Sequence, residues 1–141
     1  MPLKLTLKPG ERFVINGAVV ENGDHRASLT IMNRSNVLRE KDIMQSTDAN
    51  SPAKRIYFPV MMMYLNPESV DEYYEEFVVR MSEFMGAISN PEILTECIAV
   101  NRDLMAGENY KALVKIRRLM EYEEERLQDV ASGVQENRVA G

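Results

Sequence analysis

The spacing of apolar residues changes once along the chain, and that change constrains the fold more than any other feature. Up to about residue 43, apolar and polar residues alternate, as in LKLTLK at 3–8, which is typical of strands with one buried face. From residue 52 to about 130, apolar residues recur every three or four positions, which is typical of amphipathic helices. The sequence therefore predicts an α+β protein, with a small antiparallel β-domain followed by a helical bundle.

Five segments before residue 43 have strand character and are separated by turn residues. They are LKLTLK at 3–8, RFVI at 12–15, AVVE at 18–21, RASLTIM at 26–32 and NVLREKDI at 36–43. Pro9 and Gly10 suit the central positions of a type II turn. The dipeptide Asn22–Gly23 is typical of a tight hairpin, so we expect the third and fourth segments to pair across it.

Helix starts are marked by a proline after a capping residue, because proline suits the first helical position and Ser or Asn suits the position before it. Such pairs occur at Ser51–Pro52, Asn66–Pro67 and Asn90–Pro91. We expect helices from 52 to about 65, from 67 to about 88, from 91 to near 107, and from 108 to 130. Pro59 would interrupt a helix or a central strand alike, and a helix kinked at Pro59 is favoured for 52–65.

These patterns predict three parts of the chain. Residues 1–50 form a β-strand domain of RNA-binding type, and residues 51–132 form a helical domain. Residues 133–141 have little apolar surface to bury, so we expect a mobile tail there.

The sequence lacks the motifs of the common enzyme and metal sites, such as CxxC, HExxH, the P-loop and GxGxxG. His25, the only histidine, lies beside a predicted turn, where simple exposure is favoured over a role as general base. Cys97 lies on an apolar helical stripe, which favours a buried thiol over a nucleophile. We therefore expect no enzyme activity, no cofactor and no metal site.

The cysteine content and the lack of long apolar runs predict the location of the protein. A single cysteine excludes an intrachain disulfide framework and fits a reducing compartment. The sequence has no apolar run of about 18 residues, and its first residues lack the apolar core of a signal peptide. We expect a cytoplasmic protein without a membrane partner.

Basic residues are concentrated in the first part of this acidic chain. Residues 1–55 contain nine Lys and Arg against six Asp and Glu, a balance of +3. Residues 56–141 contain eight against sixteen, a balance of −8. Such asymmetry indicates different partners for the two parts.

Two pairs of residues in the predicted strands are candidates for contact with RNA. Lys4 and Lys8 share one side of the first strand, and Val37 and Arg39 share one side of the fifth. If these strands lie side by side, their cations could bracket a phosphate backbone, and Arg39, on an exposed face, could reach a base edge. The alternative is that these charges only solvate exposed strands.

The segments LKLTLKPGERFVINGAVVENG, NVLREKDIM and SPAKRIYFPVMMMYL, with the helical remainder, resemble the flagellum biosynthesis repressor FlbT family over essentially the whole chain. The resemblance implies a post-transcriptional regulator that binds the leader of flagellin messenger RNA and lowers its translation or stability. Some members act as positive regulators instead. A second flagellar regulator, FlaF, is the implied functional partner.

The segment GERFVINGAVVENGDHRASLTIMNRSNVLREKDI is similar, in its order of features, to the carbon storage regulator CsrA family. This resemblance implies a five-stranded RNA-binding protein that dimerises by interleaving strands, with an RNA-binding edge formed by the first and fifth strands. Its edge residues correspond to Leu5, Lys8, Val37 and Arg39. Leu7 stands where the CsrA family has the first of two adjacent arginines, so the correspondence is incomplete.

Exposed strand edges are usually paired or covered, so we expect a homodimer whose N-terminal strands pair across the subunits. A second hypothesis keeps the regulatory outcome without direct RNA binding. In that hypothesis the protein is a chaperone-like adaptor, and its Met-rich segment 61–63 and amphipathic helices bind flagellin or FlaF.

Overall fold

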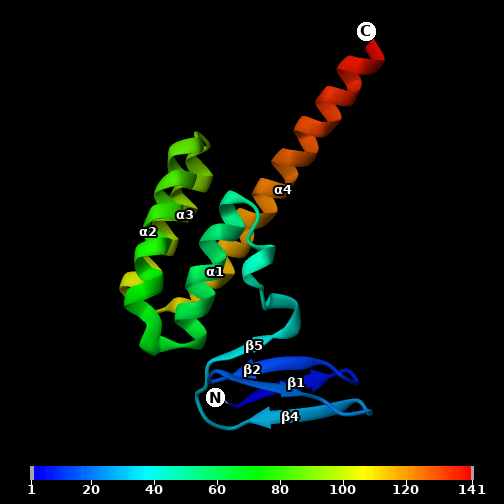
Figure 1. The fold of residues 1–141 in the computed structure, drawn as a ribbon, viewed down its shortest axis with the longest axis vertical. Coiled ribbons are helices and arrows are strands. Elements are labelled where there is room, and N and C mark those ends of the chain that lie inside the picture. The colour runs from blue at the N-terminus through cyan, green and yellow to red at the C-terminus, as the bar shows by residue number, and fades with distance from the viewer. Residues whose placement is uncertain (1, 141) are drawn as a thin grey trace.

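The computed structural model describes the backbone of residues 2–140 and the side chains of residues 2–130. Figure 1 shows the strands gathered at one end of the molecule and the helices above them, which confirms the α+β class. The strands are β1 (Leu3–Leu7), β2 (Arg12–Ile15), β3 (Ala18–Glu21), β4 (Ala27–Ile31) and β5 (Val37–Arg39). The helices are α1 (Pro52–Leu65), α2 (Val70–Ala87), α3 (Pro91–Met105) and α4 (Asn109–Ala140).

The strands form two antiparallel sheets, one with the order β1-β4 and the other with the order β3-β2-β5. The predicted β3–β4 hairpin at Asn22–Gly23 is therefore wrong. The tight turn lies at Asn16–Gly17, whose φ angles of 49° and 85° suit a two-residue type I′ turn. Asn22–Gly23 instead lies beside the first turn of the chain, where the Gly10 amide donates to the Gly23 carbonyl at 3.0 Å.

The β3-β2-β5 sheet lies between the β1-β4 sheet and the helices. On one face of it, Phe13 and Val37 pack with Leu5 and Leu7 of β1. On the other face, Leu38 is 1% exposed and belongs to the core that the helices form. Alternation along β5 therefore sends Val37 and Arg39 toward β1 and Leu38 toward the helices.

Helix α1 is the centre of the helical core, and the prediction of a helix at 52–65 is confirmed. It packs against α2 on one side and α4 on another, while α3 packs against α4. Pro59 lies inside α1 and is buried. Met61 and Met63 are each 2% exposed and fill the core, whereas Met62, between them in sequence, is half-buried.

The predicted helix ends agree with the structure in most places. The Asn90 side chain accepts hydrogen bonds from the amides of the first turn of α3, and Gly107, with φ +77°, ends that helix. The segment after Asn66 differs, because residues 67–69 form a 3₁₀ turn and α2 begins only at Val70. Helix α4 runs to Ala140 instead of ending near residue 130. The prediction of a mobile tail at 133–141 falls on residues whose side chains lie outside the described part of the chain.

No helix among the described residues has the length and apolar character needed to cross a bilayer.

Candidate nucleic-acid interface

Arg39, the last residue of β5, connects both sheets through its guanidinium group. Its Nη2 donates to the Thr6 carbonyl of β1 at 2.7 Å and to Glu11 Oε2 at 3.1 Å. The Arg39 side chain is 36% exposed, and that of Glu11 is 15% exposed. The expectation that Arg39 projects from a freely exposed face is therefore wrong, because that face of β5 is turned toward the β1-β4 sheet.

Glu11 is held in place by the turn that follows β1. The Glu11 amide donates to the Lys8 carbonyl at 3.1 Å, and the Lys8 amide donates back to Glu11 Oε1 at 2.9 Å. Gly10, with φ +72°, supplies the left-handed conformation that this turn needs. The hydrogen bond from the Lys8 amide and then that from Arg39 lower the pKa of Glu11 below its ordinary 4.5, so the carboxylate stays ionised at neutral pH.

A hollow of about 600 Å³ opens beside this ion pair, and we call it the Lys8 hollow. Its charged lining consists of four cations and two carboxylates, namely Lys8, Arg26, Arg39, Lys41, Glu11 and Glu40. The Lys8 hollow therefore carries an excess of positive charge next to the end of β5, which is the condition for attracting a phosphate backbone.

A second hollow of about 470 Å³ lies between the strands and the helices, and we call it the arginine–tyrosine hollow. Its charged lining consists of Arg34, Arg39, Lys41, Arg117 and the single carboxylate Asp42. Tyr64 of α1 and Tyr110 of α4 line it as well. Arg39 and Lys41 belong to both hollows, so the two hollows adjoin at these residues.

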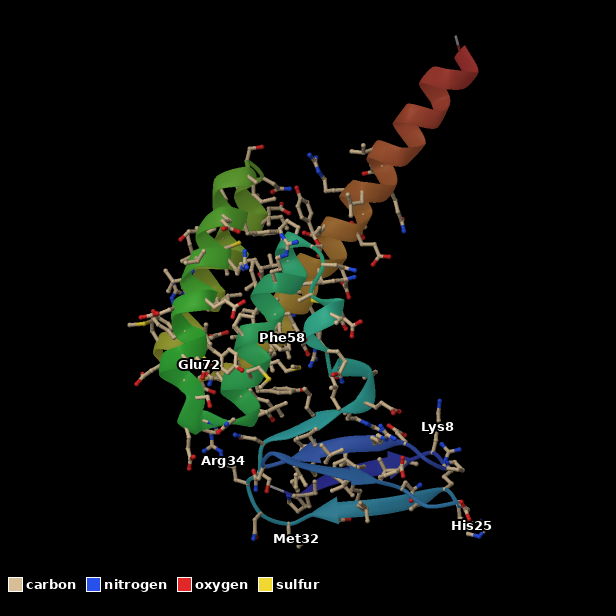
Figure 2. The ribbon with its side chains drawn as sticks, viewed as in Figure 1. Lys8, His25, Met32, Arg34, Phe58 and Glu72 are labelled. Atoms are coloured by element: carbon tan, nitrogen blue, oxygen red, sulfur yellow. The ribbon has the colours of Figure 1, made fainter. Side chains whose placement is uncertain are left out.

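The five residues predicted to contact RNA do not form one patch. Leu5 and Val37 are 4% and 8% exposed and belong to the apolar core between the sheets, so neither is available to RNA. Lys4 is exposed on the face of β1 opposite to Leu5. Lys8 lies at the turn end of the strands, with His25, whereas Arg34 and Met32 lie at the other end (Figure 2).

Four residues at the second hollow, Arg34, Tyr64, Tyr110 and Arg117, were not predicted from the sequence. The sequence position of Arg117 could have identified it as a candidate functional residue. It stands four residues after Leu113 and three before Met120, on the apolar stripe of α4, where a cation is unusual. The other three residues are brought together only by the packing of the strand layer against α1 and α4.

The remaining candidates from the sequence have ordinary environments. Cys97 is fully buried, and burial raises the pKa of its thiol to about 11, so it stays protonated. His25 is exposed at the end of the strand layer. Within the described side chains, no group of three or more His, Cys, Asp or Glu residues has the arrangement of a metal site.

Comparison with known proteins decides the family. A family model described as "Flagellar protein FlbT" matches residues 3–127, which is most of the chain. The chain belongs to the FlbT family. The family resemblance drawn from the N-terminal segments is thereby confirmed.

Curated FlbT relatives match over nearly their whole length. A "Probable flagellum biosynthesis repressor protein FlbT" of Caulobacter sp. (strain K31) is 59% identical, covering 93% of this chain and all of the relative. The "Flagellum biosynthesis repressor protein FlbT" of Caulobacter vibrioides (strain ATCC 19089 / CIP 103742 / CB 15) is 57% identical over the full length of both chains. A probable repressor of the same name from Rhodopseudomonas palustris (strain TIE-1) is 39% identical, covering 90% of this chain and 98% of the relative.

No solved structure matches the chain, so the similarity of the FlbT strand region to the CsrA family stays a prediction.

Proposed function

We propose that this chain is a post-transcriptional regulator of flagellin synthesis that binds the leader of flagellin messenger RNA and lowers its translation or stability. The names of its FlbT relatives, flagellum biosynthesis repressors, support the regulatory part of the proposal. The RNA-binding part rests on the distribution of charge around Arg39.

The local charge is the observation that carries the proposal. The two adjoining hollows are lined by six cations and three carboxylates, a local balance of +3 in a chain whose net charge is −5. An RNA strand placed along them would meet Lys8 and Arg26 at one end, Arg39 and Lys41 in the middle, and Arg34 at the other. Phosphate contacts of this kind supply salt-dependent affinity, because each neutralised phosphate releases counterions.

Arg39 is the central contact of this interface. Part of its guanidinium is occupied by Thr6 and Glu11, and the remaining edge is open to both hollows. Fixing the guanidinium in this way lowers the entropy lost when RNA binds, since the side chain is already ordered. Glu11 opposes RNA electrostatically, and it therefore sets the affinity of the site as well as its shape.

The protein is proposed to act as a homodimer whose strands pair across the subunits. β3 is at the edge of its sheet, and Val19 on it is 70% exposed. β4 is at the edge of the other sheet, with Leu29 41% exposed. Light scattering at micromolar concentration tests this: a mass of twice 16.1 kDa is expected, and a monomer contradicts it.

Direct binding by the protein alone tests the proposed function. Purified protein, without FlaF or flagellin, is titrated into a labelled transcript of the flagellin leader at several salt concentrations. The proposal expects a complex whose affinity falls as salt rises, and weaker binding to an unrelated RNA of equal length. Absence of binding at low salt contradicts it and favours the adaptor hypothesis, in which effects on RNA are indirect through FlaF or flagellin.

A further inference from the structure

The arginine–tyrosine hollow has features of a second binding site, and Arg117 lines it beside two tyrosine rings. Its guanidinium carbon lies 5.7 Å from the ring centre of Tyr110 and 6.0 Å from that of Tyr57. Asp42 Oδ2 lies 3.4 Å from Arg117 Nη2, but Nε and Nη2 have no hydrogen-bond partner among the described residues. The Arg117 side chain is 26% exposed, and these two buried nitrogens leave part of its hydrogen-bonding capacity unused.

The walls of the arginine–tyrosine hollow are fixed by hydrogen bonds between the strand layer and α1. The Tyr64 hydroxyl donates to the Val37 carbonyl at 2.9 Å, and burial raises the pKa of Tyr64, which keeps that hydroxyl protonated. The Asn36 side chain donates to the Tyr64 carbonyl at 3.1 Å. The hollow is thus formed before any ligand binds, which favours affinity.

Aromatic surface is available beside these cations. The rings of Tyr64 and Tyr110 lie 5.5 Å apart between centres, tilted by 47°, and Tyr110 remains 45% exposed. Single-stranded RNA is typically bound by this combination, in which unstacked bases lie on aromatic rings and cations follow the phosphates. The volume of about 470 Å³ is within the usual range of ligand sites.

We propose that the arginine–tyrosine hollow holds one unpaired nucleotide of RNA, with its base on Tyr110 and its phosphate at Arg34. The inference rests on the proposed function and adds to it a specific place for a single-stranded base. Arg117 is a positioning residue in this site, since it lies against the Tyr110 ring and sets its orientation. The site explains why a cation stands on the core stripe of α4.

The test compares two substitutions at Tyr110 in the full-length protein. Tyr110→Leu removes the aromatic ring but keeps an apolar side chain, and Tyr110→Phe keeps the ring. With the flagellin leader transcript as the probe, Tyr110→Leu is expected to weaken binding roughly 5- to 100-fold, and Tyr110→Phe to bind like the parent. Tyr74→Leu, on the exposed surface of α2, is the matched control and is expected to have no effect.

A second variant keeps the inference testable if Tyr110→Leu folds poorly. Arg34 is exposed, so Arg34→Gln is expected to fold normally. Loss of one phosphate contact is expected to reduce the salt dependence of binding by about 0.7 in the slope of log K against log salt. Arg102→Gln, an exposed arginine of α3, should leave that slope unchanged.

The outcomes separate this inference from the proposed function. If the parent binds the leader and both Tyr110→Leu and Arg34→Gln bind equally well, the hollow holds no nucleotide, while RNA binding stands. If the parent binds no RNA at low salt, both the inference and the proposed function are contradicted. If folded Tyr110→Leu and Tyr110→Phe weaken binding equally, base stacking on the ring is excluded.

Discussion

Arg39 and Glu11 form an ion pair with a distance of 3.1 Å between β5 and the turn that joins β1 to β2. The same guanidinium donates to the Thr6 carbonyl, so one side chain links β5, β1 and the turn that follows β1. This pair stands where the two cationic hollows adjoin. The stability of the strand layer and its proposed affinity for RNA therefore depend on the same contact.

Replacement of Arg39 is expected to affect folding. Arg39→Ala leaves the Thr6 carbonyl without this donor and the largely buried Glu11 without its cation. We expect the free energy of unfolding to fall by about 0.5–1.5 kcal/mol, the net contribution of a typical hydrogen bond, because the solvent-screened ion pair adds little. Urea denaturation measures it, with Arg26→Ala as a control that should change stability by less than about 0.5 kcal/mol.

Neutralising Glu11 is expected to increase affinity for RNA. Glu11→Gln keeps an oxygen that can accept from the Lys8 amide, so the turn is retained, while the charge that opposes phosphate is removed. A gain of roughly two- to fivefold in affinity is expected, about the Coulomb energy of one solvent-screened charge pair. Glu21→Gln, in the exposed pair with Arg12, is the control, and an equal gain there would show that only net charge matters.

The pH dependence of stability follows from the lowered pKa of Glu11. Because the folded-state pKa lies below the ordinary 4.5, the stabilisation by the ionised carboxylate is fully present above pH 4.5. It is lost as pH falls from 4.5 through the lowered folded pKa. The difference in unfolding free energy between the parent and Glu11→Gln should thus be largest near neutral pH and shrink in acid. A difference that grows in acid would contradict this assignment.

Cys97 is expected to be unreactive in the folded protein. Its thiol is fully buried and has a pKa of about 11, so little thiolate forms near neutral pH. A chromogenic thiol reagent should label it only after denaturant unfolds the helical core. Rapid labelling of the native protein at pH 8 would show that the helices around Cys97 open readily.

Local signals predicted most of the elements of this fold. The alternation in residues 3–8 gave β1, and the cap at Asn90–Pro91 gave the start of α3, because both signals lie within a few residues. The hairpin was misplaced because Asn16–Gly17 and Asn22–Gly23 are equally good turn dipeptides. The choice between them is made by pairing of β2 with β3 and of β1 with β4, which are contacts distant in sequence.

The candidate interface was less accessible to sequence analysis. The alternation of side chains along a strand correctly placed Val37 and Arg39 on one face of β5. It could not show which face of β5 is covered by another sheet. The Arg39–Glu11 pair joins residues 28 positions apart, and no local pattern indicates it. Arg34, Tyr110 and Arg117 meet only through the packing of the strand layer on α1 and α4.

Binding of the flagellin leader by Arg39→Gln across a range of salt concentrations tests the central claim most directly. If RNA lies over the Lys8 hollow and the arginine–tyrosine hollow, the purified parent protein binds the leader. Arg39→Gln then weakens that binding roughly 5- to 100-fold, whereas Arg102→Gln leaves it unchanged. A folded Arg39→Gln variant that binds as tightly as the parent at every salt concentration would contradict the account.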